Sequence, residues 1–319
     1  MFICFPMKRI RSKSYYKLFI LFIGLLATPC IKAEFVATSD NRLTHYLGLS
    51  ISGAEANRIA SQDSLVTNKA GWDAAFSATY EMNYRTWFWG FGLGLSLQQV
   101  NDVLNPFIDA LPRVDVDGEN LSYQYVYTAY REQAQTFNLS VPVYFGKYFN
   151  RVYALLGLRF DVPLDAQYDV AASMYTQGVY PWSITPVVST LDNDFSSLGF
   201  YPEQKYQYAN PYEESMYLSP FIEVGYEFLR AKKVKMRAGA YLAYAIPILN
   251  TKRVALADYS AINTNPRTQN VVNMQQNIRW NPLACADKYA SAPCKLEAGV
   301  KLSVLFNVTA IPGKCMCIP

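Results

Sequence analysis

The chain has 319 residues, of which 51% are hydrophobic and 15% aromatic, and a formal net charge of +4 at pH 7. The positive charge belongs to residues 1–33, which hold six basic and no acidic residues; without them, 29 basic against 25 acidic residues become 23 against 25. The remainder is close to neutral, so nothing basic argues for a nucleic-acid partner.

Residues 1–33 have the layout of a secretory signal peptide. Basic residues from Lys8 to Lys17 precede an apolar run over 18–27, and Ala33 is a small residue suited to cleavage. The run is shorter than the roughly 20 residues of a transmembrane helix. We predict removal of 1–33; lipid attachment at Cys30 is the alternative.

Residues 86–99 give the clearest strand. Alternate positions from Trp87 to Leu97 are large and apolar, and the positions between them are mostly Gly, Ser or Gln. Successive side chains of a strand point to opposite faces, so one face is broad and apolar. In a helix each central glycine would cost about 1 kcal/mol. Seven further segments alternate in the same way: 43–52, 72–82, 136–145, 153–162, 217–228, 236–246 and 295–307.

The connections between these segments alternate in length. Short links over 83–85, 146–151 and 229–235 alternate with long ones over 53–69, 100–132, 164–214 and 247–294. Tight periplasmic turns and long external loops are typical of outer-membrane barrels. We therefore predict an all-β fold, an eight-stranded antiparallel up-and-down transmembrane β-barrel over 34–308, with a C-terminal tail over 309–319, in the outer membrane of a Gram-negative bacterium.

Aromatic residues gather at both ends of the predicted strands, as interfacial girdles would. Near the short turns these are Trp87, Trp89, Phe145, Tyr148, Phe149, Tyr226, Phe228 and Phe306, and near the long loops Trp72 and Tyr244. The alternative is that large residues fill the core of a soluble sandwich.

Two segments carry a resemblance to a known family. Residues 137–145 read Phe-Asn-Leu-Ser-Val-Pro-Val-Tyr-Phe, and residues 153–159 read Tyr-Ala-Leu-Leu-Gly-Leu-Arg. With the pattern over 40–308, the chain resembles the eight-stranded outer-membrane β-barrel family and is similar to the OmpA transmembrane domain and to PorT-like barrels. It departs from the family in that Phe306 is followed by a tail, and no peptidoglycan-binding domain follows.

Eight charged residues lie on the predicted inward face: Glu81, Arg159, Asp161, Glu223, Glu227, Arg237, Glu297 and Lys301. An eight-stranded barrel is just wide enough for its own side chains. Isolated charges there would be costly, so we expect a lumen charge network of ion pairs. A narrow ion-conducting path is the alternative, and paired carboxylates for glycoside chemistry are disfavoured.

Few residues suggest other chemistry. His45 is the single histidine and lies at the short-turn end, away from the rim where a catalytic base is expected. Cys285 and Cys294 share the fourth long connection and form a candidate disulfide, which a secretory route permits. Cys315 and Cys317 lie in the tail, whose role the sequence leaves open. We expect no catalytic or metal site.

The long connections are rich in tyrosine, which offers contact area at low entropy cost. These tyrosines are Tyr123, Tyr125, Tyr127, Tyr130, Tyr168, Tyr175, Tyr180, Tyr201, Tyr206, Tyr208 and Tyr212. They either form a recognition surface or extend the sheet and pack on one another.

These observations predict a monomeric outer-membrane protein that displays external loops for surface interaction or envelope structure. We expect no enzymatic activity, no cofactor and no nucleic-acid partner. The expected partners are the lipid bilayer with its lipopolysaccharide, and an extracellular protein or glycan bound by the loops. The alternatives are a transport or secretion component and a membrane-embedded lipid hydrolase.

Overall fold

The computed structural model describes residues 43–59, 66–114, 119–183, 185–188, 200–231, 233–248, 255–259, 278–283, 286 and 294–309. The predicted signal peptide, Cys285 and the tail cysteines lie outside these residues. Among the described residues, no helix has the length and apolarity needed to cross a membrane.

The described elements are all strands. Their bounds are β1 Thr44–Arg58, β2 Val66–Tyr84, β3 Trp87–Leu104, β4 Phe107–Val114, β5 Asn120–Phe149, β6 Val152–Val179, β7 Val187–Val188, β8 Gln204–Pro211, β9 Tyr217–Arg230, β10 Val234–Pro247, β11 Ala257–Asp258, β12 Arg279–Trp280 and β13 Lys295–Asn307.

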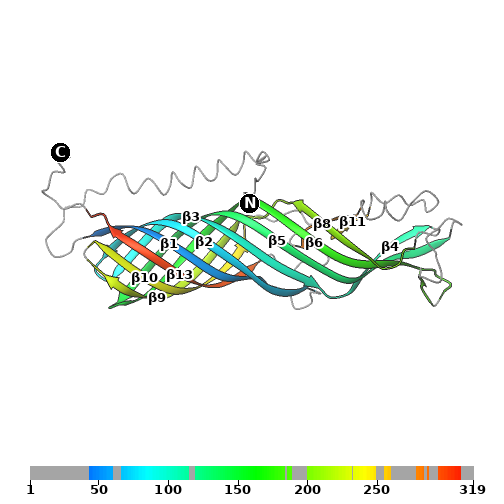
Figure 1. The fold of residues 1–319 in the computed structure, drawn as a ribbon, viewed down its shortest axis with the longest axis horizontal. Coiled ribbons are helices and arrows are strands. Elements are labelled where there is room, and N and C mark those ends of the chain that lie inside the picture. Colours follow the sequence, from blue (N-terminus) through cyan, green and yellow to red (C-terminus); the bar gives the residue numbers. More distant parts are fainter. Residues whose placement is uncertain are drawn as a thin grey trace, which may run out of the picture. The chain divides into compact units, whose positions relative to one another are not determined.

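Eight of these strands close into a ring (Figure 1). Each pairs antiparallel with its neighbours in the order β1, β2, β3, β5, β6, β9, β10 and β13, and β13 pairs back onto β1. The closing register runs from Tyr46 opposite Asn307 to Arg58 opposite Lys295. The eight predicted segments are these strands, so the antiparallel up-and-down order is confirmed.

Tight turns join the ring strands at one end. Arg85 lies between β2 and β3 with a φ of 54°, and Asn150 lies between β5 and β6 with a φ of 64°. Asn tolerates this left-handed region better than most residues. We call this end of the ring the turn end.

The expected bounds of the long connections are wrong, because the strands run further. The connection expected over 100–132 is mostly strand: β3 continues to Leu104, β4 pairs with β5, and β5 begins at Asn120. Likewise β6 continues to Val179 and pairs with β8. The alternation persists there, but Tyr, Gln and Thr replace the large apolar residues that marked the strands. We call this part beyond the ring, β4, β8 and the far halves of β5 and β6, the extension.

The ring exposes apolar side chains and buries polar ones, the opposite of a water-soluble protein. Large apolar side chains point outward and are exposed on all eight strands, including Leu49, Phe76, Leu95, Phe145, Leu156, Ile222, Leu242 and Val300. Polar and charged side chains point inward and are buried. Tyr148, expected in the outer girdle, is an exception and a correction: it faces the interior and packs against Phe88 with ring centroids 4.7 Å apart.

Inward glycines make room for inward aromatic rings. A Cβ on Gly225 would lie 2.5 Å from the Tyr153 Oη and close to the Ala238 backbone oxygen, and a Cβ on Gly90 would lie 2.5 Å from Cζ of Tyr144. A strand glycine often marks such a close approach. Gly90 and Gly225 therefore leave the space that the Tyr144 and Tyr153 rings occupy at the inner wall.

Replacing Gly225 with Ala should destabilise the ring by about 1–3 kcal/mol, the usual cost of overpacking, because the Tyr153 ring has to move. Gly53→Ala is the matched control, since a Cβ there meets nothing nearer than an Asp73 backbone oxygen at 4.0 Å. Urea unfolding followed by tryptophan fluorescence measures both. Equal urea midpoints of unfolding for the two variants would show that the position of the Tyr153 ring does not depend on a glycine at 225.

Candidate functional site

Charged side chains fill the ring in successive tiers, and the tier nearest the turn end centres on Arg237. Its guanidinium lies 2.9 Å from Glu81 and donates to the Tyr148 hydroxyl at 3.3 Å. Tyr144 donates to the same carboxylate at 3.2 Å, and the Tyr153 ring lies 4.9 Å from Arg237 Cζ. Aromatic rings and one carboxylate thus compensate a fully buried cation.

The next tier pairs Lys301 with Glu223. The ammonium lies 2.9 Å from the carboxylate, and the Tyr153 hydroxyl donates to the other carboxylate oxygen at 2.6 Å. Both oxygens of this nearly inaccessible carboxylate are therefore satisfied, as a buried charge requires.

Arg159 bridges two carboxylates in the third tier. It lies 2.9 Å from Asp161 and 2.7 Å from Glu297. Ser140 and Ser219 donate to Asp161 at 2.6 and 2.9 Å. The partners come from β5, β6, β9 and β13, so this tier ties strands far apart in sequence.

Lys295 and Gln98 continue the third tier. Lys295 donates to the Gln98 side-chain oxygen at 2.9 Å, and the Gln98 amide donates to Glu297 at 2.9 Å. Asp73 lines a cavity of about 10 Å³ here with one carboxylate oxygen unpaired among the described residues. That volume holds about one water molecule, so side chains close the interior at this level.

A further cluster lies at the end of the ring opposite the turn end, where Arg58 meets two carboxylates. The guanidinium lies 2.5 Å from Asp102 and 3.3 Å from Glu132, and all three side chains are almost completely buried. The backbone N–H of Leu283 donates to Glu132 at 2.8 Å. Burial raises the pKa of Glu132 from its usual 4.5 to about 7, against the opposing effects of Arg58 and this N–H.

Aromatic residues pack over this cluster and form what we call the cap. Tyr259 stacks on Tyr125 with centroids 3.9 Å apart, and its hydroxyl lies 2.8 Å from that of Tyr127. Trp280 donates to the Tyr127 hydroxyl at 3.3 Å. Residues 255–259, 278–283 and 286, from the last long connection, thereby pack on β4, β5, β6 and β8. Of the two interpretations of the loop tyrosines, sheet extension with mutual packing is the one seen for these residues.

The structure brings all eight predicted lumen residues to the inner face. Glu81 lies with Arg237, Glu223 with Lys301, and Arg159 with Asp161 and Glu297, while Glu227 pairs with Arg230. Arg230, a half-exposed residue at the β9 end, was not among the predicted partners. What the network does for the protein stays a proposal.

Six members of the site are absent from the predicted network. Asp73, Gln98 and Lys295 lie on the inward faces of predicted strands but were not assigned to the network, whereas Arg58, Asp102 and Glu132 lie beyond the predicted strand ends. A signal was present: the even-numbered positions of β1, β3 and β5 face inward near the turn end, and the same parity continues to Arg58, Asp102 and Glu132. Extending the alternation past the last large apolar residue would have found them.

Two other candidates are placed as follows. The His45 Nδ1 atom lies 2.6 Å from the Tyr80 hydroxyl at the turn end, with the rings 5.9 Å apart. Cys294 is half-buried, and the candidate disulfide stays a prediction because Cys285 lies outside the described residues.

Comparison with family models gives no match. Comparison with curated proteins gives none either. Among solved structures, a Pseudomonas aeruginosa FadL homologue matches at 8% identity over 85% of this chain and 91% of that chain, with a TM-score of 0.16. A bacterial polysaccharide outer membrane secretin matches at 11% identity over 82% of this chain and 98% of that chain, with a TM-score of 0.12. At such low TM-scores neither similarity bears on the fold or the activity of this chain.

The raised pKa of Glu132 predicts that the folded chain loses stability as the pH rises. Between pH 4.5 and about 7 the folded chain holds a proton that the unfolded chain releases. The stabilisation is therefore complete below pH 4.5 and is lost as the pH rises through 7, by up to about 3 kcal/mol. Urea unfolding should give a lower free energy of unfolding at pH 8 than at pH 5.

Glu132→Gln is the matched variant, because its amide oxygen still accepts the Leu283 N–H but cannot ionise. Its free energy of unfolding should fall less than that of the wild type between pH 5 and pH 8. A variant with the full wild-type pH dependence would show that other groups control the stability.

Proposed function

We propose that the ring is a plugged transmembrane β-barrel in the outer membrane of a Gram-negative bacterium, and that it holds the extension and cap outside the cell for surface interaction. The observation that carries the proposal is the inverted burial of the ring. Leu156 and Val300 are 64% and 67% exposed, whereas Glu81 and Glu227 are completely buried. In water this arrangement would be strongly unfavourable.

The extent of the apolar surface supports a bilayer rather than a protein partner. Exposed apolar residues occur on every strand of the ring, whereas soluble monomers rarely expose a patch larger than a few hundred Å². On β3 the surface runs from Trp87 to Leu97, which matches the roughly 9–11 residues of a tilted spanning strand. A closed ring also satisfies the backbone groups that lipid cannot.

Aromatic residues mark one boundary of this surface. Trp87 and Phe145 stack outside the turn end with centroids 5.1 Å apart, and the Lys147 ammonium lies 4.7 Å from the Trp87 ring. Aromatic rings beside cations are typical of the level where hydrocarbon meets headgroups.

Side chains fill the interior of the ring, which favours a role in displaying the extension over a role in conducting ions. Paired side chains occupy the ring from the Arg237 tier to the Arg159 tier. The cavity beside Asp73 in the Arg159 tier has a volume of about 10 Å³. We therefore expect no steady ion conduction, and we expect no enzymatic activity. The proposed barrel acts as a monomeric anchor without a cofactor.

The end of the extension offers a surface for an extracellular protein or glycan. Trp182 is 70% exposed, stacks on Tyr180 and donates to Glu119 at 3.0 Å. Exposed aromatic side chains held by neighbours are enriched at recognition surfaces. Which ligand binds is left to experiment.

A charge placed on the apolar surface tests the membrane-spanning part of the proposal. Leu93→Arg, in the middle of the spanning part of β3, should destabilise the chain in phospholipid vesicles by about 2–4 kcal/mol. Ile108→Arg, at a similarly exposed apolar residue of β4 in the extension, should cost little. Leu93 and Ile108 are 50% and 48% exposed, so a chain in water would tolerate both changes equally.

The orientation is tested by protease treatment of intact cells. Trypsin added outside should cut at the exposed Lys205 of β8, which pairs only with β6 among the described strands, and spare Arg151 and Lys233 of the turns. After lysis the turn sites should become accessible. Cleavage at the turns of intact cells would reverse the proposed orientation.

A further inference from the structure

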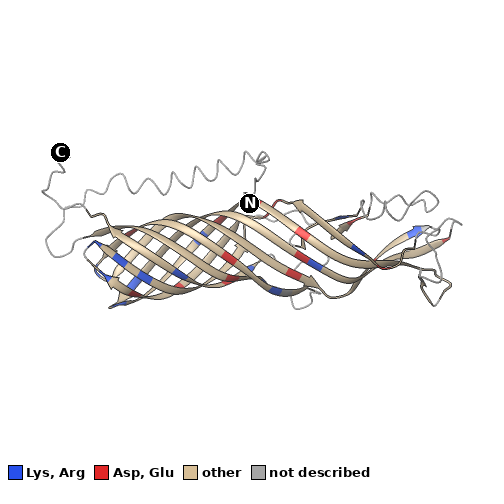
Figure 2. Cartoon of the chain, viewed as in Figure 1, with Lys and Arg blue, Asp and Glu red and all other residues tan. Residues whose placement is uncertain are grey.

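Basic side chains gather at the turn end and form what we call the basic collar (Figure 2). Its described members are Arg85, Lys147, Arg151, Arg230, Lys233 and Lys235. The segments that meet there, 43–46, 82–88, 145–153, 226–236 and 304–309, contain a single acidic residue, Glu227. Glu227 is completely buried and is paired with Arg230, so the exposed surface of the collar carries only positive charge.

Aromatic rings hold some of these cations at the boundary of the apolar surface. The Lys147 ammonium lies 4.7 Å from the Trp87 ring and 5.3 Å from the Phe149 ring, and both rings are exposed. The Lys147 ammonium therefore lies where the apolar surface ends. The Lys235 ammonium lies 4.2 Å from the ring of Tyr46, which is buried and faces the interior, so Lys235 lies at the mouth of the ring.

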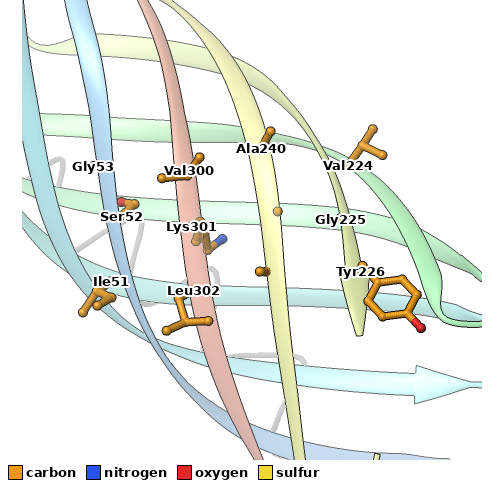
Figure 3. A pocket seen from close by; sticks show the side chains of 12 residues that line it. Ile51, Ser52, Gly53, Val224, Gly225, Tyr226, Ala240, Val300, Lys301 and Leu302 are labelled. Atoms are coloured by element: carbon orange, nitrogen blue, oxygen red, sulfur yellow. The ribbon is translucent and has the colours of Figure 1, made fainter. Parts of the chain in front are cut away.

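An apolar groove begins on the outer wall above the collar (Figure 3). We call it the wall groove; its volume is about 700 Å³, and it spans β9, β10, β13 and β1. Small side chains line its floor and larger ones its sides: Ala238 and Ala240, then Val224, Tyr226, Val300 and Leu302. On the inner side the Tyr153 ring lies against Gly225 and Gly239, so the wall is packed from within.

The groove and the collar are continuous along β10. Ala238 is five residues from Lys233, which is about 17 Å along a strand. One leaflet of a hydrocarbon core is about 15 Å thick. A molecule with a negatively charged head at the collar and a hydrocarbon chain of leaflet length therefore matches both features at once.

We propose that the collar residues beside β9 and β10, namely Arg151, Arg230 and Lys233, bind an anionic phospholipid of the leaflet at the turn end together with the wall groove. The inference rests on the proposed membrane-spanning function. Exposed Arg and Lys side chains bind the phosphate groups, as such side chains do at anionic membrane surfaces. One acyl chain lies in the groove between the Val224 and Val300 sides. Ala238 and Ala240 leave the space that this chain fills.

Native mass spectrometry of the full chain in a neutral detergent tests the proposal. The probes are dioleoylphosphatidylglycerol, which is anionic, and dioleoylphosphatidylcholine, which has the same chains and no net charge. We expect tighter binding of phosphatidylglycerol, with a preference that weakens as salt is added. Equal binding of the two lipids overturns the proposal.

A collar variant combines Arg151→Gln and Lys233→Gln in the turns beside β9 and β10, and leaves Arg230 in its pair with Glu227. Each basic group near an anionic surface strengthens binding about fivefold, so phosphatidylglycerol binding should fall by up to about twenty-five-fold. Phosphatidylcholine binding should change little. The matched control removes two exposed basic residues of the extension, Arg131 and Lys205, and should retain the preference.

A groove variant, Ala238→Leu with Ala240→Leu, should weaken both lipids about tenfold, the equivalent of two methylene groups leaving an apolar contact. Ala78→Leu, an outward alanine of β2 away from the groove, is its control. A muropeptide offers carboxylates without acyl chains, and its binding in place of phosphatidylglycerol would assign the collar to the cell wall and overturn the proposal.

Gel migration before and after boiling distinguishes failure of the proposed lipid site from failure of the proposed barrel. A variant that keeps the heat-modifiable form but loses phosphatidylglycerol binding supports the proposed lipid site. A wild-type chain that is heat-modifiable but binds both lipids equally overturns the site and leaves the barrel intact. A wild-type chain without a heat-modifiable form overturns the proposed function itself.

Discussion

Closure of the sheet between β1 and β13 is the constraint on which the rest of the structure depends. Without that pairing both strands would expose a row of unpaired backbone groups, and the two faces of the sheet would be open to the same surroundings. Closure makes one face the outside and the other a narrow interior. An eight-stranded ring leaves room inside only for side chains. The inward residues must therefore satisfy one another.

This requirement explains the character of the interior. Glu81 is compensated by Arg237, Glu223 by Lys301, and Arg159 by two carboxylates, while tyrosine and serine hydroxyls satisfy remaining oxygens. Removing one partner of such a buried pair costs far more than the pair contributes. Because the partners come from different strands, the pairs also favour one register over its neighbours. We propose that the charged interior serves to specify the register of the ring, in keeping with the proposed role as an anchor.

The two ends of the ring differ in their chemistry. At one end, Arg58 and two carboxylates are buried under the aromatic cap, and the cap reaches Glu132 through the Leu283 N–H. At the turn end the basic side chains are mostly exposed and have few acidic residues near them. The Lys147 ammonium lies beside the Trp87 ring. In the proposed membrane these ends would orient the molecule, with the extension on one side and the proposed lipid-binding surface on the other.

The sequence alone determined the eight strands, their faces and the inward position of eight charged residues, because side-chain alternation and loop length are local properties visible in one chain. The large apolar residues that mark the outward face stop before the ends of β3, β5 and β6, and Tyr and Gln replace them. The predicted strands were therefore too short. The sequence also could not say that Arg58 meets Asp102 and Glu132, or that Tyr148 turns inward to Arg237. Those contacts join residues far apart in sequence, and only the closed ring with its cap brings them within bonding distance.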